Sequence, residues 1–205
     1  MSDSQSGPPS RPDRRAERGE STRAALVTAA RELFSERGYR AVGTSEIVER
    51  AGVTRGALYH HFRDKRDLFR AVYEQAEREI VETTASKMSA IEDPWELLVG
   101  GIGSFFDACT DPALMQIGLV DGPAVLGWQE WREVGSRYAL GLVTFGLQNA
   151  MDAGALRPAD VRQLAHLIFG ALGEAALLIA NSDDPQAARQ EAEATVLVLL
   201  EGLQA

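Results

Sequence analysis

Apolar residues recur every three to four positions along most of this chain, which places them on one face of an α-helix. The first stripe starts after two candidate N-cap residues, Ser21 and Thr22, and stops before Gly38, a residue suited to the end of a helix. Strict alternation of apolar and polar residues, the signature of a strand, does not occur over a useful length. The pattern therefore predicts an all-α fold of about nine helices.

Two short helical patterns joined by a tight turn follow this first helix. They span residues 44–62 and read TSEIVERAGVTRGALYHHF. Gly52 supplies the turn, Thr54 caps the second helix, and Leu58 and Phe62 anchor that helix to the core. The outward face is then formed by Arg55, Gly56, Tyr59 and His60. A helix that follows such a turn is the one that enters the major groove of DNA, so this stretch predicts a helix-turn-helix.

The helices beyond this motif predict a second, larger domain. A fourth helix begins after the N-cap candidate Asp64 and keeps its apolar stripe for at least four turns, long enough to connect the two domains. Interruptions between helices are expected at residues 111–112, 121–123 and 181–185. Pro158 is expected to open the penultimate helix. The predicted helices of the second domain start near Pro94, Pro112, Trp128, Pro158 and Ala188.

Residues 1–19 lack hydrophobic periodicity and are rich in Pro, Ser, Gly and Arg, which predicts a disordered N-terminal arm. Two interpretations of the arm remain open: a solvated tail, or a segment whose arginines contact the DNA backbone. The remaining boundaries place the DNA-binding domain at residues 20–70 and a ligand-binding and dimerisation domain at residues 71–205.

The charge distribution supports a DNA-binding N-terminal part. The whole chain has a net charge of −9, which by itself is unusual for a DNA-binding protein. Residues 1–70, however, contain 14 Arg and Lys against 10 Asp and Glu, whereas residues 71–205 contain 7 against 20. The basic charge is therefore concentrated where the helix-turn-helix is expected, on an otherwise acidic protein.

These residues resemble a known family. The segments TRAALVTAARELFSERGY and TSEIVERAGVTRGALYHHF, followed by Lys65 and Leu68, are similar to the DNA-binding domain of tetracycline-repressor (TetR) family regulators. The segment DGPAVLGWQEW looks like part of one of the family's C-terminal ligand-binding domains. The resemblance implies a transcriptional regulator that binds a double-stranded DNA operator as a homodimer and responds to a small-molecule effector.

The resemblance also implies roles for individual residues. Phosphate contacts are expected from Thr44, Tyr59 and Lys65. The start and exposed face of the recognition helix are formed by Thr54, Arg55, Gly56, Ala57 and His60, with Ala57 placed to contact a thymine methyl group. The guanidinium group of Arg55 matches the O6 and N7 acceptors of guanine, and Gly56 lets the backbone approach the duplex closely.

Aromatic residues gather on three helices of the second domain, and two interpretations of them remain open. They form either an ordinary core or the wall of a pocket for a largely apolar effector, to which His166 would add a polar group unless it is a buried neutral histidine. The predicted ligand-binding residues are Phe105, Phe106, Met115, Trp128, Trp131, Tyr138, Phe145 and His166.

The last two helices carry small and aliphatic faces that predict a homodimer interface, although the same faces could pack within one protomer. A single helix-turn-helix reads only one half-site, which favours the dimer. The combined prediction is a repressor that an apolar ligand releases from a pseudo-palindromic operator, with an activator or a ligand-independent regulator as alternatives.

Other chemistry finds little support in the sequence. No cofactor is expected, and His60 and His61 point about 100° apart on a helix, which disfavours a shared metal ion. Cys109 is expected to be a small core residue, and the only plausible catalytic trio is Glu130, His166 and Glu174. The lone cysteine, the polar N-terminus and the lack of an uninterrupted apolar run of membrane-spanning length indicate a cytoplasmic protein with no membrane partner.

Overall fold

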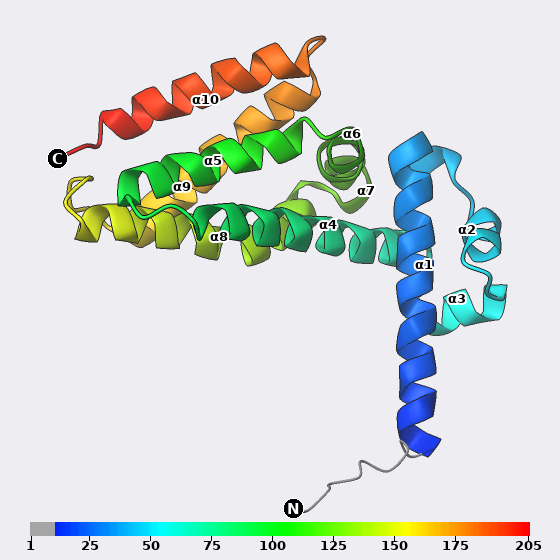
Figure 1. The fold of residues 1–205 in the computed structure, drawn as a ribbon. Coiled ribbons are helices and arrows are strands. Elements are labelled where there is room, and N and C mark those ends of the chain that lie inside the picture. Colours follow the sequence, from blue (N-terminus) through cyan, green and yellow to red (C-terminus); the bar gives the residue numbers. More distant parts are fainter. Residues whose placement is uncertain (1–10) are drawn as a thin grey trace, which may run out of the picture.

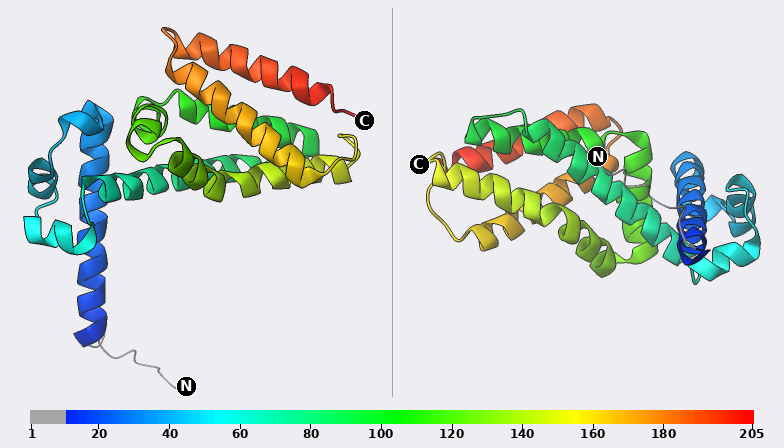
Figure 2. Two further views of the ribbon diagram at one scale, coloured as in Figure 1. Left: turned by 180° about the vertical axis from the view of Figure 1, so that it is seen from behind. Right: turned by 60° about the horizontal axis from the view of Figure 1, so that its bottom comes forward.

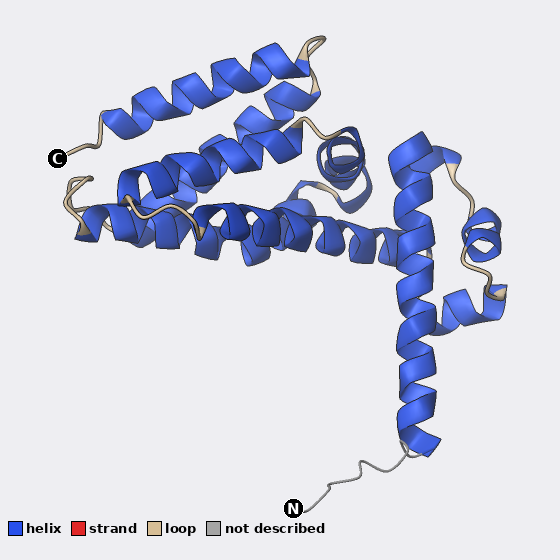
Figure 3. Cartoon of the chain, viewed as in Figure 1, coloured by secondary structure: helices blue, strands red, loops and turns tan. Residues whose placement is uncertain are grey.

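The computed structural model describes residues 11–205 of the chain, with side chains from residue 18 onward. In this part of the chain every regular element is helical, apart from an isolated bridge between Leu156 and Gln204 (Figure 3). The elements are α1 (Arg11–Ala41), α2 (Thr44–Arg50), α3 (Arg55–His61), α4 (Lys65–Met88), α5 (Pro94–Cys109), α6 (Pro112–Met115), η1 (Gln116–Asp121), α7 (Gly122–Leu126), α8 (Trp128–Asp152), α9 (Val161–Ala180) and α10 (Pro185–Glu201). Because α6, η1 and α7 follow one another without a break, they count as one helical segment, and the eleven elements form nine segments in the described residues. The predicted all-α fold is confirmed.

Helix α1 begins ten residues earlier than the sequence pattern indicated. Of the predicted arm, residues 1–10 lie outside the described residues, and residues 11–19 belong to α1. A helix can form there without an apolar stripe because Arg, Ala and Glu are strong helix formers and Pro is tolerated in the first turn. Figure 1 shows this end of α1 projecting past α2 and α3, where no other helix covers it.

The helix-turn-helix forms as predicted. Gly52 adopts a φ of 66° in the turn between α2 and α3, a conformation that residues with a side chain rarely adopt. The side chain of Thr54 accepts a hydrogen bond from the backbone N–H of Ala57, and Asp64 caps α4 in the same way through Asp67. Leu58 is fully buried and anchors α3. Phe62 is also buried in this core, so the caps and the two predicted anchors, Leu58 and Phe62, fix the outward direction of α3.

Helix α4 leads from the helix-turn-helix into the C-terminal helices (Figure 1). It has 24 residues, so it is about 36 Å long. Its first turns belong to the core built with α1, α2 and α3, and that core continues without interruption to Ile117, Leu126 and Trp131. The domain boundary at residue 70 stays a prediction, since one hydrophobic core crosses it.

The C-terminal helices pack in layers that both views of Figure 2 show. Helices α4 and α8 lie against each other, α5 and α9 pack on them, and α10 packs on α5 and α9. The second core lies between these layers, around Phe106, Leu147, Leu172 and Ile179. The layering leaves one face of α9 and α10 without a partner helix in the described chain.

The structure corrects two expected helix boundaries. Residues 121–123 do not interrupt the helix, because η1 runs directly into α7. The helical path ends instead at Gly127, where φ is 78°. Pro158 does not open the penultimate helix either, because α9 starts at Val161 after the N-cap Asp160. Proline is compatible with the first turn of a helix but does not require one.

Helix α9 starts later than expected but is strongly apolar. Its 20 residues include an 18-residue window with a mean hydropathy of 1.6, so by length and composition alone it could cross a membrane. Only 28% of that window is buried within the protomer, where α9 packs against α8 and α10.

Candidate nucleic-acid interface and internal cavity

The outer surface of α3 presents hydrogen-bond donors and very little apolar side chain. Thr54, Arg55, Gly56, Tyr59 and His60 are exposed, and Ala57 is half-buried. Hydrogen-bond donors on the first turn of an exposed helix can reach both phosphates and base edges. The structure therefore brings together the residues that the sequence assigned to this face.

Tyr59 connects the two helices of the motif. Hydrogen bonds from Arg55 and Thr44 to its hydroxyl group lower the pKa of Tyr59. The guanidinium carbon of Arg55 also lies 5.6 Å from the centre of the Tyr59 ring. Thr44 at the start of α2 and Arg55 at the start of α3 therefore hold one aromatic side chain between them, and the three form one continuous polar surface.

Lys65 has a different environment from the one expected for a phosphate contact. Its Nζ donates hydrogen bonds of 2.9 Å to the carbonyl oxygens of Tyr39 and Val42 and lies 3.9 Å from the centre of the Tyr39 ring. Burial lowers the pKa of Lys65. Two of its three N–H donors are used inside the protein, so Lys65 joins the start of α4 to the last turn of α1 and the residue that follows α1.

An internal cavity lies between α4, α5, α8 and α9. The space free of protein atoms within it, together with its opening to solvent, is about 970 Å³. Most of the lining is apolar, and the residues with polar groups are Tyr73, Glu77, Thr84 and Arg132. A cavity of this kind suits a largely apolar molecule.

Of the eight residues predicted to bind ligand, Phe105 and Trp131 line the cavity. The other six do not: Phe106, Met115, Trp128, Tyr138, Phe145 and His166. Phe106 is fully buried in the core, whereas Trp128 and Phe145 are 54% and 52% exposed. The part of α8 that faces the cavity includes Gly135, Ala139 and Gly146, because space remains where side chains are small. The helices that carry the predicted aromatic residues therefore border the cavity, but only two of the eight predicted residues line it.

His166 is exposed on α9, not buried as the default interpretation had it. The inward face of α9 consists of Ala165, Ile168, Leu172, Ala176 and Ile179. His166 follows Ala165 directly, so its side chain points about 100° away from that face.

Glu77 lines the cavity but was not among the predicted ligand-binding residues. Burial raises the pKa of Glu77 from 4.5 to about 7, and a hydrogen bond from Tyr73 offsets part of this rise. The same burial, together with Glu77, raises the pKa of Tyr73. The available signal was Glu77's place on the apolar stripe of α4, four residues after Tyr73 and three before Ile80.

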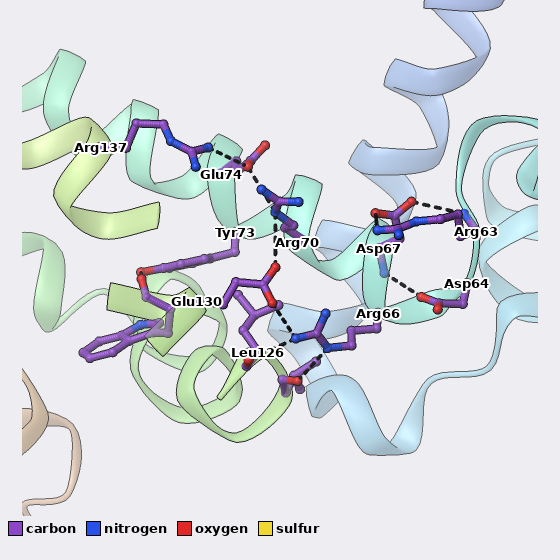
Figure 4. Close-up of polar contacts among 12 residues, drawn as sticks. Arg63, Asp64, Arg66, Asp67, Arg70, Tyr73, Glu74, Leu126, Glu130 and Arg137 are labelled. Atoms are coloured by element: carbon purple, nitrogen blue, oxygen red, sulfur yellow. Dashed lines mark hydrogen bonds and ion pairs between the residues drawn. The ribbon is translucent and has the colours of Figure 1, made fainter. Parts of the chain in front are cut away.

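A network of charged residues joins α4 to the start of α8 near the cavity (Figure 4). Arg66 contacts the Glu130 carboxylate at 2.5 Å and donates hydrogen bonds to the carbonyl oxygens of Val125 and Leu126. Arg70 lies 3.3 Å from the same carboxylate. Glu130 directly precedes Trp131, whose indole Nε1 donates to the Gly118 carbonyl at 2.8 Å. The cavity wall and the base of the helix-turn-helix are therefore connected through adjacent residues.

A second connection runs from η1 to the end of α1. The buried side chain of Asp121 accepts a 2.7 Å hydrogen bond from the backbone N–H of Tyr39 and a 3.1 Å hydrogen bond from Gln116. Gly38, just before this contact, has a φ of 76°, which a residue with a side chain would adopt only with strain. The C-terminal helices thus contact the helix-turn-helix at both α1 and α4.

The alternative chemistry gains no geometric support. Glu130 is held by the two arginines, whereas His166 and Glu174 are exposed on α9, eight residues and about 12 Å apart along the helix axis. No cluster of three potential metal ligands occurs among the described residues. Cys109 is buried, and this burial raises the pKa of its thiol, which disfavours the reactive thiolate.

Comparison with known proteins agrees with this geometry. Residues 26–72 match the family described as bacterial regulatory proteins, tetR family, and residues 95–203 match a tetracyclin repressor-like C-terminal domain. The chain is 30% identical over 150 residues to the transposon Tn10 TetC protein of Escherichia coli, which covers 73% of this chain and 76% of that protein.

Solved structures show the same fold. A TetR-family transcriptional regulator from Pectobacterium atrosepticum is 35% identical with a TM-score of 0.83, covering 92% of this chain and 97% of that one. RolR in complex with resorcinol is 26% identical with a TM-score of 0.73, covering 90% of each chain. The two matched domains together take in the helix-turn-helix and, of the helices around the cavity, α5, α8 and α9. The chain therefore belongs to the tetracycline-repressor family of transcriptional regulators.

Proposed function

We propose that the protein is a cytoplasmic, homodimeric repressor that a small, largely apolar effector releases from a pseudo-palindromic DNA operator. The observation that carries this proposal is the course of α4. Its first turns complete the core of the helix-turn-helix, and its later turns supply Tyr73, Glu77 and Thr84 to the cavity wall. A ligand that displaces this one helix moves the DNA-reading surface with it.

The DNA contacts are assigned to the exposed surface of α3 and the start of α2. Arg55 and His60 face base edges, Thr44 and Tyr59 contact phosphates, and Gly56 allows close approach of the backbone. Lys65 acts mainly by bracing α4, because two of its N–H donors are already used. Two such surfaces, one from each protomer, would occupy successive major grooves.

The dimer interface is assigned to α9 and α10. Four large apolar side chains on these helices are more than half exposed: Leu167, Leu178, Val198 and Leu199. Apolar patches of this kind on a soluble protein mark interaction surfaces. Members of this family act as dimers, and burial of this patch between two copies accounts for the low burial of α9 within one protomer.

The effector is assigned to the cavity. The similar RolR structure contains resorcinol, a small aromatic molecule, which supports this class of ligand. The network of Arg66, Arg70 and Glu130 gives the cavity a direct route to the start of α4. By thermodynamic linkage, a ligand releases DNA only if it binds the DNA-free conformation more tightly, and DNA then weakens ligand binding by the same factor.

The test uses the full-length protein and a duplex selected from random sequence. Compounds that raise the melting temperature of the protein are titrated into the protein–duplex complex, and duplex affinity is followed by fluorescence anisotropy. We expect these compounds to weaken duplex binding and the duplex to weaken compound binding by an equal factor. Equal compound affinities for free and DNA-bound protein would exclude release by the ligand. A promoter–reporter assay checks the direction of regulation, and increased transcription on DNA binding would contradict a repressor.

A further inference from the structure

The carboxyl group of Glu77 faces the cavity from α4 at a point where three other helices converge. A Cβ atom added to Gly135 on α8 would lie 3.8 Å from Glu77 Oε2, 3.4 Å from the Tyr73 hydroxyl and 3.7 Å from Phe169 Cζ on α9. Cys109 on α5 is also close enough for the charge of Glu77 to affect its thiol. Glu77 is therefore a polar group set in the wall of an otherwise apolar space.

Glu77 has fewer hydrogen-bond partners than a carboxyl group can use. An ionised carboxylate accepts about four hydrogen bonds. The Tyr73 hydroxyl has a single proton to donate, and it is shared between Glu77 and the carbonyl oxygen of Trp131, to which it donates at 3.4 Å. Among the described residues, no cation lies close enough to Glu77 to offset the cost of burying its charge. Acceptor capacity remains on the side of Glu77 that faces the cavity.

Arg132 narrows the choice of ligand charge. It lines the same cavity from α8, and its guanidinium carbon lies 5.3 Å from the centre of the Phe169 ring. The Phe169 ring is thus near Arg132 and also near the Gly135 backbone that Glu77 approaches. Glu77 and Arg132 place groups of opposite charge in one cavity, so an ammonium or a carboxylate on the ligand would be attracted to one of them and repelled by the other. An uncharged hydroxyl group avoids both repulsions and still supplies the donor that Glu77 lacks.

We propose that Glu77 selects the ligand of this cavity, and that the ligand is an uncharged, apolar molecule whose hydroxyl group donates a hydrogen bond to the Glu77 carboxyl group. This inference rests on the proposed ligand-binding role of the cavity. The aromatic rings of Phe105, Trp131 and Phe169 surround the apolar body of the ligand, and Glu77 determines which polar group that body carries.

Four probes with one apolar body test the inference: butylbenzene, 4-butylphenol, 4-butylbenzoate and 4-butylbenzylamine. Their dissociation constants are measured by calorimetry at pH 7 for the wild-type protein and for Glu77→Leu, which removes the acceptor. Glu77→Gln keeps the shape of the side chain and an acceptor oxygen but removes the charge. Glu82→Gln is the matched control, because Glu82 is exposed on the same helix and does not line the cavity.

The decisive quantity is the affinity ratio of 4-butylphenol to butylbenzene. We expect this ratio to be roughly tenfold higher in the wild-type protein and in Glu82→Gln than in Glu77→Leu, with Glu77→Gln between them, because the phenol loses a hydrogen bond to a charged group. Butylbenzene should bind all four proteins with similar affinity. The charged probes should bind the wild-type protein more weakly than the phenol.

The possible failures are distinguishable. If butylbenzene binds but the phenol ratio is the same in the wild-type protein and in Glu77→Leu, the role of Glu77 is wrong and the cavity remains a ligand site. Tighter binding of the amine or the benzoate than of the phenol would overturn the proposed ligand class. If none of the four probes binds the wild-type protein, the ligand-binding role of the cavity fails, and the inference fails with it.

Discussion

At the scale of single residues, this protein places a few polar groups where each has a specific consequence. Glu77 lies in an apolar cavity at a cost in stability, and Lys65 has its ammonium group held by two backbone carbonyls. On the outer surface, Arg55 is exposed beside Tyr59. Buried and exposed polar groups lead to different predictions. A buried group such as Glu77 affects the stability of the protein, whereas an exposed group such as Arg55 is available to recognise DNA.

The burial of Glu77 predicts a pH-dependent stability. Its pKa in the folded protein is about 7, against 4.5 ordinarily, so the folded protein keeps the proton in a pH range where the unfolded chain has lost it. The free energy of unfolding therefore falls as pH rises from about 4.5 through 7. At pH 8.5 the free energy of unfolding of Glu77→Gln should exceed that of the wild-type protein by up to about 3 kcal/mol, and this difference should fall to about 1 kcal/mol or less at pH 5.

Urea unfolding at the two pH values measures this difference, with Glu82→Gln as the exposed control. The other titratable or charged groups around Glu77 are Tyr73 and Cys109, which stay neutral in this range, and Arg132, which stays charged. A stability difference of the same size at both pH values would show that Glu77 is not the titrating group.

Because Arg55 is exposed on α3, its replacement should reduce the preference of the protein for particular DNA sequences. Arg55→Ala should weaken operator binding by about 10- to 100-fold and relax the preference at one base pair in each half-site, because a bidentate contact to guanine is lost. Binding-site selection from random duplexes measures this preference. Arg63→Ala, an exposed arginine paired with Asp67, is the control and should leave the base preference unchanged. A preserved preference in Arg55→Ala would assign base recognition to other residues.

At the scale of elements, α4 is the helix that both halves of the molecule share. The ion pairs of Glu130 with Arg66 and Arg70 attach α4 to α8 beside the cavity residue Trp131 (Figure 4). Asp121 forms a second attachment, from η1 to the backbone of Tyr39. We therefore expect a movement of α8 or η1 around a ligand to reach the helix-turn-helix through these direct contacts.

Removing one of these attachments should reduce the coupling without unfolding the protein. Glu130→Gln should lower the free energy of unfolding by no more than about 1 kcal/mol, because both ion pairs are partly exposed. It should, however, reduce the factor by which a cavity ligand weakens DNA binding. Titrations of ligand and duplex, separately and together, measure this factor.

Glu133→Gln is the matched control for this prediction, since Glu133 is exposed on the same helix and contacts Gln129. An unchanged coupling factor in Glu130→Gln would show that the signal does not pass through the α4–α8 ion pairs, and Asp121 would then be the next contact to test.

At the scale of the whole molecule, charge and exposed apolar surface are separated in a way that suits a DNA-binding dimer. The basic excess lies in residues 1–70 and the acidic excess in residues 71–205, so the acidic part is repelled from DNA while α3 approaches it. The exposed apolar side chains of α9 and α10 belong to the acidic part of the chain.

Disrupting this apolar surface should convert the dimer into a monomer. Leu178→Asp places a charge at a side chain that is 65% exposed on α9, and a charge buried without a partner opposes association. Light scattering should then report a monomer, and operator affinity should fall by roughly 100-fold, because the two half-sites no longer bind together. Val120→Asp, at an apolar side chain 45% exposed on η1, is the control. A Leu178→Asp variant that remains dimeric would place the interface elsewhere.

Local sequence rules were sufficient to predict the fold class and the helix-turn-helix. Both depend on local rules: the 3.6-residue periodicity, the Thr54 and Asp64 caps, and Gly52 in the turn with positive φ. These rules act between residues that are close in the sequence, so the helix-turn-helix could be predicted without knowledge of the tertiary structure. Local rules were insufficient where a helix lacks an apolar stripe, as at the start of α1, and where Pro158 did not open a helix.

Only the tertiary structure decided what lines the cavity and what connects it to the DNA-reading surface. The high density of aromatic residues in the sequence suggested that these residues line the cavity. A cavity, however, lies where facing side chains are small, and that depends on how four helices pack. Glu77 became a candidate ligand contact because α4, α8 and α9 converge around Gly135. Glu130 became a connecting residue because Arg66 and Arg70, sixty or more positions away in sequence, lie beside it. Such contacts depend on helix packing, which periodicity along one helix does not determine.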